Sequence, residues 1–204
     1  MSEEQTFLNA IRQESDEPVH RHAFADWLED RDDPRAELIR IHLDLEEIPD
    51  YLHDSSEAGN RRRQWWKKHP RLWLDLLPEV KDLQWCFPRG IPEQAQMYST
   101  LLFRACSQEV FGQSALHRIQ FRSRHGCQSL SRVARLQDMT ELSFHRAGLQ
   151  NERALNLIQS PNIDNLTSLD LVENFLTNGI IRALAQRGLK KLRRLDLSKN
   201  QIGN

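Results

Sequence analysis

The sequence predicts an α/β protein in which an N-terminal helical domain precedes a short solenoid, with parallel strands on the concave face and helices outside. Apolar residues recur at steps of three and four over the first 49 residues, which indicates amphipathic helices. A leucine-rich pattern then recurs every 23 to 27 residues as far as Ile202, which indicates stacked strand–helix units. We therefore predict a helical domain over 1–49, a helical basic and tryptophan-containing connector over 50–79, and a repeat array over 80–204.

The composition is that of an ordinary globular protein. The chain has 204 residues, of which 39% are hydrophobic and 28% charged. The opening MSEEQTFL lacks the apolar run of a secretory signal, and no stretch reaches the roughly 18 apolar residues of a membrane helix. The three cysteines, Cys86, Cys106 and Cys127, do not suggest a disulfide framework. We expect a cytoplasmic protein with no membrane partner.

Charge is divided unevenly along the chain. Residues 1–60 hold 5 of the 28 basic residues and 17 of the 29 acidic ones, a net charge of −12, and the remainder carries +11. The acidic part and the basic part can attract each other, or the basic part can face an anionic partner.

Three helices are predicted in the N-terminal domain. The first spans about 2–14 with Ser2 as its N-cap, and the second spans about 16–31 with a proline in its first turn. The third spans about 33–48, with Asp33 as its cap and a proline at the first helical position.

Acidic residues crowd the junction between the second and third helices. We interpret this cluster as a helix corner, because acids are favoured at helix N-termini and two nearby arginines can pair with them. The spacing matches no calcium loop, and nothing marks a catalytic carboxylate pair. The residues concerned are Asp26, Glu29, Asp30, Asp32, Asp33, Arg35 and Arg40.

Two motifs in this domain carry a family resemblance. The stretches ADWLE from Ala25 and DPRAELIR from Asp33 resemble the repeat-companion domain of planctomycete bacteria, and the resemblance covers about residues 3–48. It implies a helical module of a bacterial protein, placed ahead of a repeat array. It implies no enzymatic activity.

The predicted connector begins with a polar stretch, 50–60, that we expect to be a loop. A run that mixes basic residues with Trp65 and Trp66 follows. Such a run can bind the phosphates of nucleic acid or of a membrane surface. Alternatively, the tryptophans pack the two parts of the chain together while the basic side chains stay solvated or meet the acidic domain, and we favour this interpretation. The candidate anion-binding residues are Arg61, Arg62, Arg63, Lys67, Lys68 and Arg71.

The repeat pattern is LxxLxLxxNxL. It starts at Leu166 and again at Leu192, with an isoleucine in the last position of the second copy. Weaker copies start at Met139 and Leu116, and a degenerate one at Val80. Helices are expected between the strands, over 98–110, 152–159 and 178–186.

Repeats of this length with a full helix resemble the ribonuclease-inhibitor type of leucine-rich repeat. The resemblance implies about four to five repeats, of which the first is irregular and the last incomplete. It also implies that Asn174 and Asn200 bond to the backbone of neighbouring repeats and are structural.

The candidate binding surface is the concave face of the predicted sheet. Residues that alternate with the leucines point out from this face. Their mixed charge suits a protein partner better than a phosphate backbone, which would require a uniformly basic surface. The candidates are Arg118, Gln120, Arg122, Glu141, Ser143, His145, Ser168, Asp170, Val172, Arg194, Asp196 and Ser198.

Enzyme signatures are missing from the sequence. We find no P-loop, GxGxxG, HExxH, CxxC or GxSxG motif, and expect no catalytic residue, cofactor or metal. The sequence therefore predicts a non-enzymatic interaction module, a scaffold or a regulatory subunit. The alternative is a nucleic-acid-binding accessory protein that uses the basic connector together with Arg118, Arg122 and Arg124.

The last repeat ends shortly after its strand, with no helix behind it. Its apolar residues are then expected to be half uncovered, since terminal repeats need a polar cap. Either a longer natural chain or a partner covers this end. We expect a partner subunit or a second copy to pack on the last strand. The alternative is that the residues after Leu197 fray and the uncovered end is tolerated.

Overall fold

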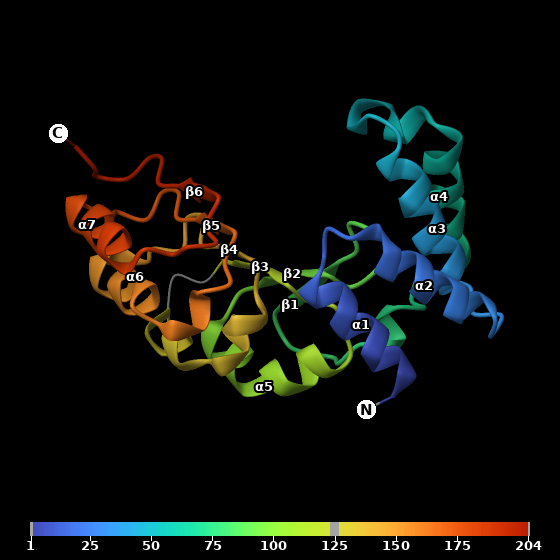
Figure 1. Ribbon diagram of the computed structural model, residues 1–204, viewed down its shortest axis with the longest axis horizontal. Coiled ribbons are helices and arrows are strands. Elements are labelled where there is room, and N and C mark those ends of the chain that lie inside the picture. The colour runs from blue at the N-terminus through green and yellow to red at the C-terminus, as the bar shows by residue number, and fades with distance from the viewer. Residues whose placement is uncertain (1, 123–126, 204) are drawn as a thin grey trace. The chain divides into compact units, whose positions relative to one another are not determined.

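The computed structural model describes residues 2–122 and 127–203, which form two compact units (Figure 1). The first unit comprises residues 1–79, 86–93 and 112–115, and the second comprises 80–85, 94–111 and 116–204. The predicted connector, 50–79, thus belongs to the same unit as the N-terminal helices. Along the described part of the chain, no helix combines the length and apolar character needed to cross a membrane.

The three predicted N-terminal helices are present in the first unit. The Ser2 hydroxyl accepts the Gln5 N–H at 3.2 Å and caps the first helix, as predicted. The second helix begins at Pro18, two residues later than predicted, because the fixed φ of proline suits the first helical turn. The helices are α1 (Glu3–Gln13), α2 (Pro18–Glu29) and α3 (Arg35–Glu46), followed by η1 (Asp50–Ser55), α4 (Glu57–Lys68) and η2 (Leu74–Leu76), where η denotes a 3₁₀ helix.

The prediction of a loop over 50–60 is wrong, because η1 and the start of α4 occupy it. Ser56 caps α4 by accepting the Gly59 N–H at 3.0 Å. Gly59 lies against the end of η1, where a Cβ atom would sit 1.8 Å from the carbonyl oxygen of His53. The glycine that suggests a loop in the sequence is therefore the residue that lets the helix pack closely on the preceding turn.

The core of the first unit mixes large apolar side chains with buried arginines. Phe24, Leu38 and Trp73 are at most 1% exposed. Arg21 and Arg35 are also buried, and each has a carboxylate partner: Glu46 lies 3.0 Å from Arg21, and Glu4 lies 2.6 Å from Arg35. Buried charges are tolerated in proteins when they are paired in this way.

A buried histidine gives this unit a sensitivity to pH. His42 on α3 packs close to Gly90, a glycine with φ of 76°. Its Nε2 atom is buried and has no hydrogen-bond partner within the described structure. Burial, followed by the positive charge of Arg62, lowers the pKa of His42 to about 4. The imidazole is therefore neutral in the folded protein at neutral pH.

We predict that the free energy of unfolding of the first unit falls by about 2 kcal/mol between pH 7 and pH 5, at 1.36 kcal/mol per pKa unit. Below about pH 6.5 the unfolded chain binds a proton at His42 that the folded chain does not bind until the pH nears 4, so stability is lost as the pH falls through this window. Urea titrations followed by tryptophan fluorescence measure the change. His42→Leu should flatten the pH dependence, and the same change at exposed His22 should not. A parent-like slope in His42→Leu would contradict the assignment.

The second unit is built on one sheet. Its strands follow chain order among the described residues, and the pairs from β2 to β6 are parallel. Helices occupy three of the connections and lie close to the predicted ranges, and the connection from β3 to β4 contains the 3₁₀ helices η3 (Cys127–Arg132) and η4 (Ala134–Asp138) instead. The strands are β1 (Leu83–Cys86), β2 (Gln94–Met97), β3 (Arg118–Phe121), β4 (Glu141–Ser143), β5 (Ser168–Asp170) and β6 (Arg194–Asp196), and the helices are α5 (Thr100–Gly112), α6 (Gln150–Ile158), α7 (Asn178–Arg187) and η5 (Pro161–Ile163).

Strand β2 is not predicted by the sequence analysis. It is only four residues long, and the signal that could have found it is the alternation of Gln94 and Gln96 with Ala95 and Met97. Both apolar residues are fully buried and both glutamines are partly exposed. The strand therefore adds two more polar side chains, those of Gln94 and Gln96, to the polar face of the sheet.

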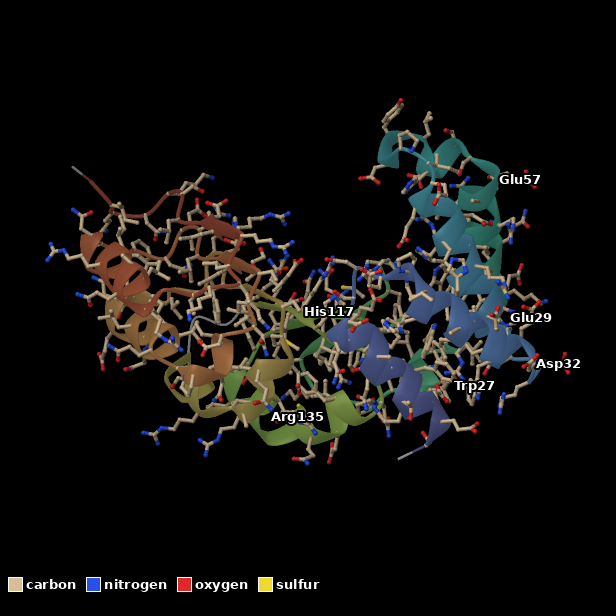
Figure 2. All side chains as sticks on the ribbon, viewed as in Figure 1. Trp27, Glu29, Asp32, Glu57, His117 and Arg135 are labelled. Carbon is tan, nitrogen blue, oxygen red and sulfur yellow. The ribbon has the colours of Figure 1, made fainter. Side chains whose placement is uncertain are left out.

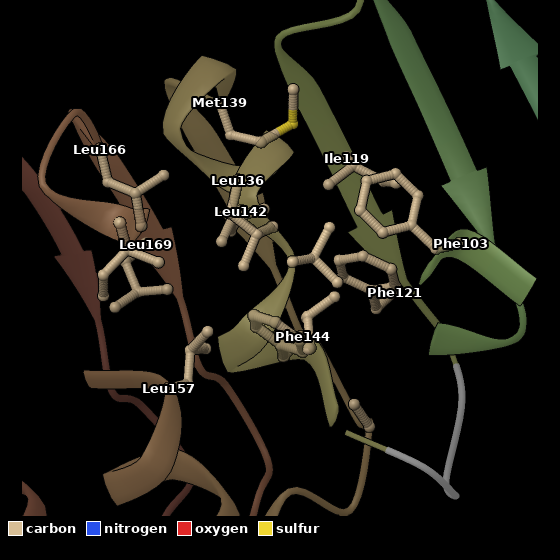
Figure 3. Close-up of a cluster of buried hydrophobic side chains, with 14 of the residues drawn as sticks. Phe103, Ile119, Phe121, Leu136, Met139, Leu142, Phe144, Leu157, Leu166 and Leu169 are labelled. Carbon is tan, nitrogen blue, oxygen red and sulfur yellow. The ribbon is translucent and has the colours of Figure 1, made fainter. Parts of the chain in front are cut away.

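The opposite face of the sheet packs into the core of the second unit (Figure 3). Ile119, Leu142 and Leu169 lie in register on neighbouring strands, and each is at most 2% exposed. Phe121 and Phe144 stack with ring centroids 5.3 Å apart. The leucine positions of the sequence pattern therefore form rows across the sheet, as the repeat spacing predicts.

The asparagines of the repeat pattern bond to backbone groups, as predicted. The Asn174 side chain accepts the Leu149 N–H at 3.1 Å and donates to the carbonyl oxygens of Phe144 and Val172 at 2.8 and 3.0 Å. One repeat further along, Asn200 Oδ1 accepts the N–H of Asn174 at 2.8 Å. Each asparagine thus joins its own turn to the preceding turn by hydrogen bonds.

Candidate functional site

One groove on the second unit gathers most of the candidate binding residues. It has a volume of about 370 Å³ and lies along the polar face of the sheet. Eight of the twelve residues predicted from the sequence line it, and Gln94 of β2 joins them. The eight are Arg118, Gln120, Glu141, Ser143, Ser168, Asp170, Arg194 and Asp196.

The strand register orders these side chains in two rows. The first row runs Gln94, Arg118, Glu141, Ser168, Arg194, and the second runs Gln96, Gln120, Ser143, Asp170, Asp196. The first row mixes both signs of charge, and the second changes from neutral amides to carboxylates. The face is therefore polar and mixed in sign, and the carboxylates of its second row lie at β5 and β6.

Contacts between neighbouring strands hold parts of these rows in place. Arg118 Nε lies 3.5 Å from Glu141 Oε1 in the first row. In the second row the Ser143 hydroxyl donates to Asp170 Oδ2 at 2.8 Å. The other oxygen of Asp170 accepts the Val172 N–H at 2.9 Å, so this carboxylate is fixed from two sides. A partner would meet side chains that are already oriented.

The turns that follow the strands add charged residues that the sequence analysis missed. Arg146, Glu173 and Lys199 have φ of 57°, 57° and 55°, a left-handed conformation that non-glycine residues rarely adopt. Glu173 pairs with Arg146 and lies 3.5 Å from Lys199. The hydrogen bond from Arg146 and the two positive charges lower the pKa of Glu173. The recurrence of these residues at the repeat spacing could have identified them.

Four of the predicted residues do not line the groove. His145 lies beside its acidic end, 4.0 Å from both Asp170 and Glu173. Arg122 is exposed beyond the end of β3, and Ser198 donates its backbone N–H to Asp196. The prediction that Val172 points outward needs correction, because its side chain is 6% exposed. Strand β5 ends at Asp170 and the chain turns, so the alternation of the strand does not extend to Val172.

The basic connector is largely neutralised by acidic residues. Arg61 lies 2.9 Å from Asp44, Arg62 lies 2.9 Å from Asp54, and Arg71 lies 3.0 Å from Asp75. Arg63 lies 3.8 Å from the same carboxylate as Arg62. Trp65 is buried and donates its indole N–H to the Pro34 carbonyl at 2.9 Å, so it is not a stacking platform for bases. Ion pairs are described for four of the six candidate anion-binding residues; Lys67 and Lys68 have none among the described residues.

The acidic cluster is the corner between α2 and α3. Figure 2 shows Glu29 and Asp32 at the C-terminal end of α2. Arg40 bridges Glu29 and Asp26, with shortest contacts of 2.5 and 2.6 Å. The predicted cap at Asp33 lies one residue too early, because α3 begins at Arg35 and Pro34 occupies its N-cap position. Asp33 still accepts the Arg35 N–H at 2.9 Å. Within residues 2–122 and 127–203, no group of three or more histidine, cysteine or acidic residues is arranged to hold a metal ion.

Comparison with known proteins adds no functional information. No family model, no curated protein and no solved structure matches this chain.

Proposed function

We propose that this chain is a non-enzymatic protein-interaction module that binds a protein partner across the polar face of the sheet. The observation that carries the proposal is the groove lined by eight of the predicted residues. The chain would act as a scaffold or as a regulatory subunit of a larger assembly.

The charge pattern of the face supports a protein partner. Arg118, Glu141 and Arg194 place both signs in one row, and Asp170 and Asp196 make one end of the other row negative. Such a pattern discriminates between protein surfaces, because like charges placed opposite each other cost binding free energy. A phosphate backbone would be repelled by the acidic end.

We further propose that the second unit is a leucine-rich-repeat array and that the first is a repeat-companion module. Support comes from the rows of buried leucines and from the bonds that Asn174 and Asn200 make to neighbouring turns. In such arrays the sheet face is the usual binding surface.

The nucleic-acid alternative has less support. Of its proposed contacts, Arg61, Arg62, Arg63 and Arg71 pair with aspartates, and Arg124 lies outside the described residues. Arg118 also faces Glu141. Retention on heparin tests this alternative directly: a retention that disappears with rising salt, together with a shift of nucleic acid in a gel, would favour it.

The protein-partner proposal predicts that the double variant Arg118→Glu/Arg122→Glu weakens partner capture by about tenfold or more. The reason is that the charge of Arg118 in the groove and the charge of the exposed Arg122 beyond the end of β3 both change sign. Quantitative mass spectrometry after capture on the tagged chain measures the loss, protein by protein. Asp170→Asn, which keeps an oxygen that can accept the Val172 N–H, should reduce capture of the same proteins.

The matched control is Asp26→Lys/Asp30→Lys on the acidic cluster, which should leave capture unchanged. Circular dichroism should be native for all variants. Capture that is lost in the control and retained in the sheet-face variants would place the interface on the first unit and overturn the proposal.

A further inference from the structure

The turn that follows β5 carries an exposed aromatic side chain. Phe175 is 65% exposed, whereas its neighbours in the chain, Asn174 and Leu176, are fully buried. The preceding turn donates the Gln150 N–H to the Asn174 carbonyl at 3.2 Å. The following turn donates the Gln201 N–H to the Leu176 carbonyl at 2.8 Å. Because other turns are bonded to this one on both sides, the exposure of Phe175 is not that of an edge.

The backbone conformation of Phe175 is also unfavourable for its side chain. Its φ of 59° lies in the left-handed region, which disfavours bulky side chains and which glycine adopts freely. Gly148 holds the same position in the copy of the sequence pattern that starts at Met139, and its φ is 60°. Every other non-glycine residue with a positive φ in the described chain is charged or an amide. Phenylalanine therefore occupies a position at which the fold favours glycine or a small polar residue.

Contacts on both sides of Phe175 fix the backbone that carries the ring. Asn200 Oδ1 accepts the N–H groups of Asn174 and Leu176, the residues before and after Phe175, at 2.8 and 3.0 Å. The Asn174 side chain is itself bonded to the preceding turn, through the Leu149 N–H at 3.1 Å. The ring is therefore attached to a backbone that is ordered before a partner binds, which lowers the entropy cost of binding.

The surface of this turn is continuous with the groove on the polar face of the sheet. Asp170 lines the groove, and His145 lies 4.0 Å from Asp170 and 4.0 Å from Glu173. Glu173 is ion-paired with Arg146 and precedes Phe175 by two residues. An aromatic side chain beside charged and polar contacts is typical of the residues that contribute most to protein–protein binding. One ring among ion-paired side chains does not provide the wide apolar face that binds a membrane surface.

We propose that Phe175 is an apolar anchor for the protein partner that binds the groove. The partner spans the groove and the turn after β5, and it covers the ring with an apolar depression bordered by charged groups that complement Glu173 and Arg146. This inference rests on the proposed function, because the same partner occupies the groove. It explains why a bulky apolar residue is retained at an exposed, left-handed position where it does not favour folding.

The first test concerns folding alone. Phe175→Asn removes the ring and introduces a residue that tolerates the left-handed region. Its melting temperature, measured by calorimetry on the 204-residue chain, should equal or exceed that of the parent. A lower melting temperature would show that the ring stabilises the fold, and it would overturn the proposal.

The second test measures partner capture on the tagged chain. Phe175→Asn should reduce by about tenfold or more the capture of the same proteins that are lost from the sheet-face variants, Arg118→Glu/Arg122→Glu and Asp170→Asn. The matched control is Val19→Asn on α2, which makes the same kind of change at a side chain that is 59% exposed. It should leave capture unchanged.

The outcomes distinguish this inference from the proposed function. Parental capture by Phe175→Asn, with loss in the sheet-face variants, would overturn the inference alone. Unchanged capture in all of these variants would overturn both. Loss in Phe175→Asn alone would place the ring in a separate interface, against both. A parent chain that dimerises in sedimentation velocity, and that becomes monomeric as Phe175→Asn, would show that a second copy covers the ring and would also overturn the inference.

Photo-crosslinking tests direct contact with the ring position. p-Benzoylphenylalanine incorporated at position 175 should, on irradiation, crosslink to the proteins that are lost from the sheet-face variants. The same amino acid incorporated at position 19 should not crosslink to them. Crosslinks from both positions, or from neither, would contradict the proposed anchor.

Discussion

Replacing Asn174 by leucine is expected to lower the free energy of unfolding of the second unit by about 3–5 kcal/mol. Asn174 is fully buried and satisfies three backbone groups, those of Phe144, Leu149 and Val172. Leucine has a similar size but no hydrogen-bonding atoms, so it would leave the Leu149 N–H without its acceptor. The carbonyls of Phe144 and Val172 would each lose one of two bonds, because they also accept the N–H groups of Ala147 and Arg146 at 3.0 Å. A buried donor without a partner costs about 1–3 kcal/mol, and each lost bond costs about 0.5–1.5 kcal/mol. Chemical denaturation followed by far-UV circular dichroism measures the loss.

Asn200 offers a matched control for this prediction. It makes the same kind of bonds one repeat later, to the carbonyls of Leu171 and Leu197, but it lies at the partly exposed edge of the sheet. Water can replace its bonds there, so Asn200→Leu should cost only about 1–2 kcal/mol. An Asn174→Leu chain with parental stability that failed to capture partner proteins would show that Asn174 binds a ligand, against the structural role derived above.

Replacing Arg35 by methionine is expected to lower the free energy of unfolding of the first unit by about 2–3 kcal/mol. The Arg35 side chain is 6% exposed, and its guanidinium lies 2.6 Å from Glu4 and 2.7 Å from Asp33. It also lies over the ring of Trp73, 4.7 Å from the centroid. Methionine preserves most of the packing volume but leaves two carboxylates unpaired. Because these carboxylates are partly exposed, the cost is below the roughly 3–5 kcal/mol of a fully buried pair.

The pKa of Asp33 provides a second measurement for the same variant. Burial would raise this pKa, but the hydrogen bonds and charge of Arg35 outweigh it and lower it. A lowered pKa in the folded state means that Asp33 contributes stability at neutral pH, and that this contribution is lost as the pH falls through the folded pKa. NMR titration should find a higher pKa for Asp33 in Arg35→Met.

Arg40→Met is the control for Arg35→Met. Arg40 also contacts two carboxylates, but its side chain is 37% exposed, so its loss should cost less than about 1 kcal/mol. Equal losses for the two variants in urea titrations followed by tryptophan fluorescence would show that burial of Arg35 does not set its contribution.

Much of this fold follows from local patterns. Apolar steps of three and four located α1, α2 and α3, and a hydroxyl at Ser2 with an amide three residues later located the start of the first helix. The leucine spacing located β3 to β6 and the rows of side chains that alternate with the leucines. These features are visible in the sequence because the geometry of a helix or strand fixes which neighbouring residues share a face.

The tertiary structure decided the features that depend on distant residues. In the sequence Gly59 suggests a loop, but in the structure it lies in a helix that packs against η1. In the sequence Val172 continues the alternation of exposed residues, but in the structure β5 ends at Asp170 and the chain turns. Arg35 meets Glu4 across 31 residues of sequence, and His42 is buried beside Gly90, 48 residues away along the chain. Burial and ion pairing depend on which elements pack against each other. The periodic pattern of apolar residues within one helix or strand does not indicate which other elements it will contact.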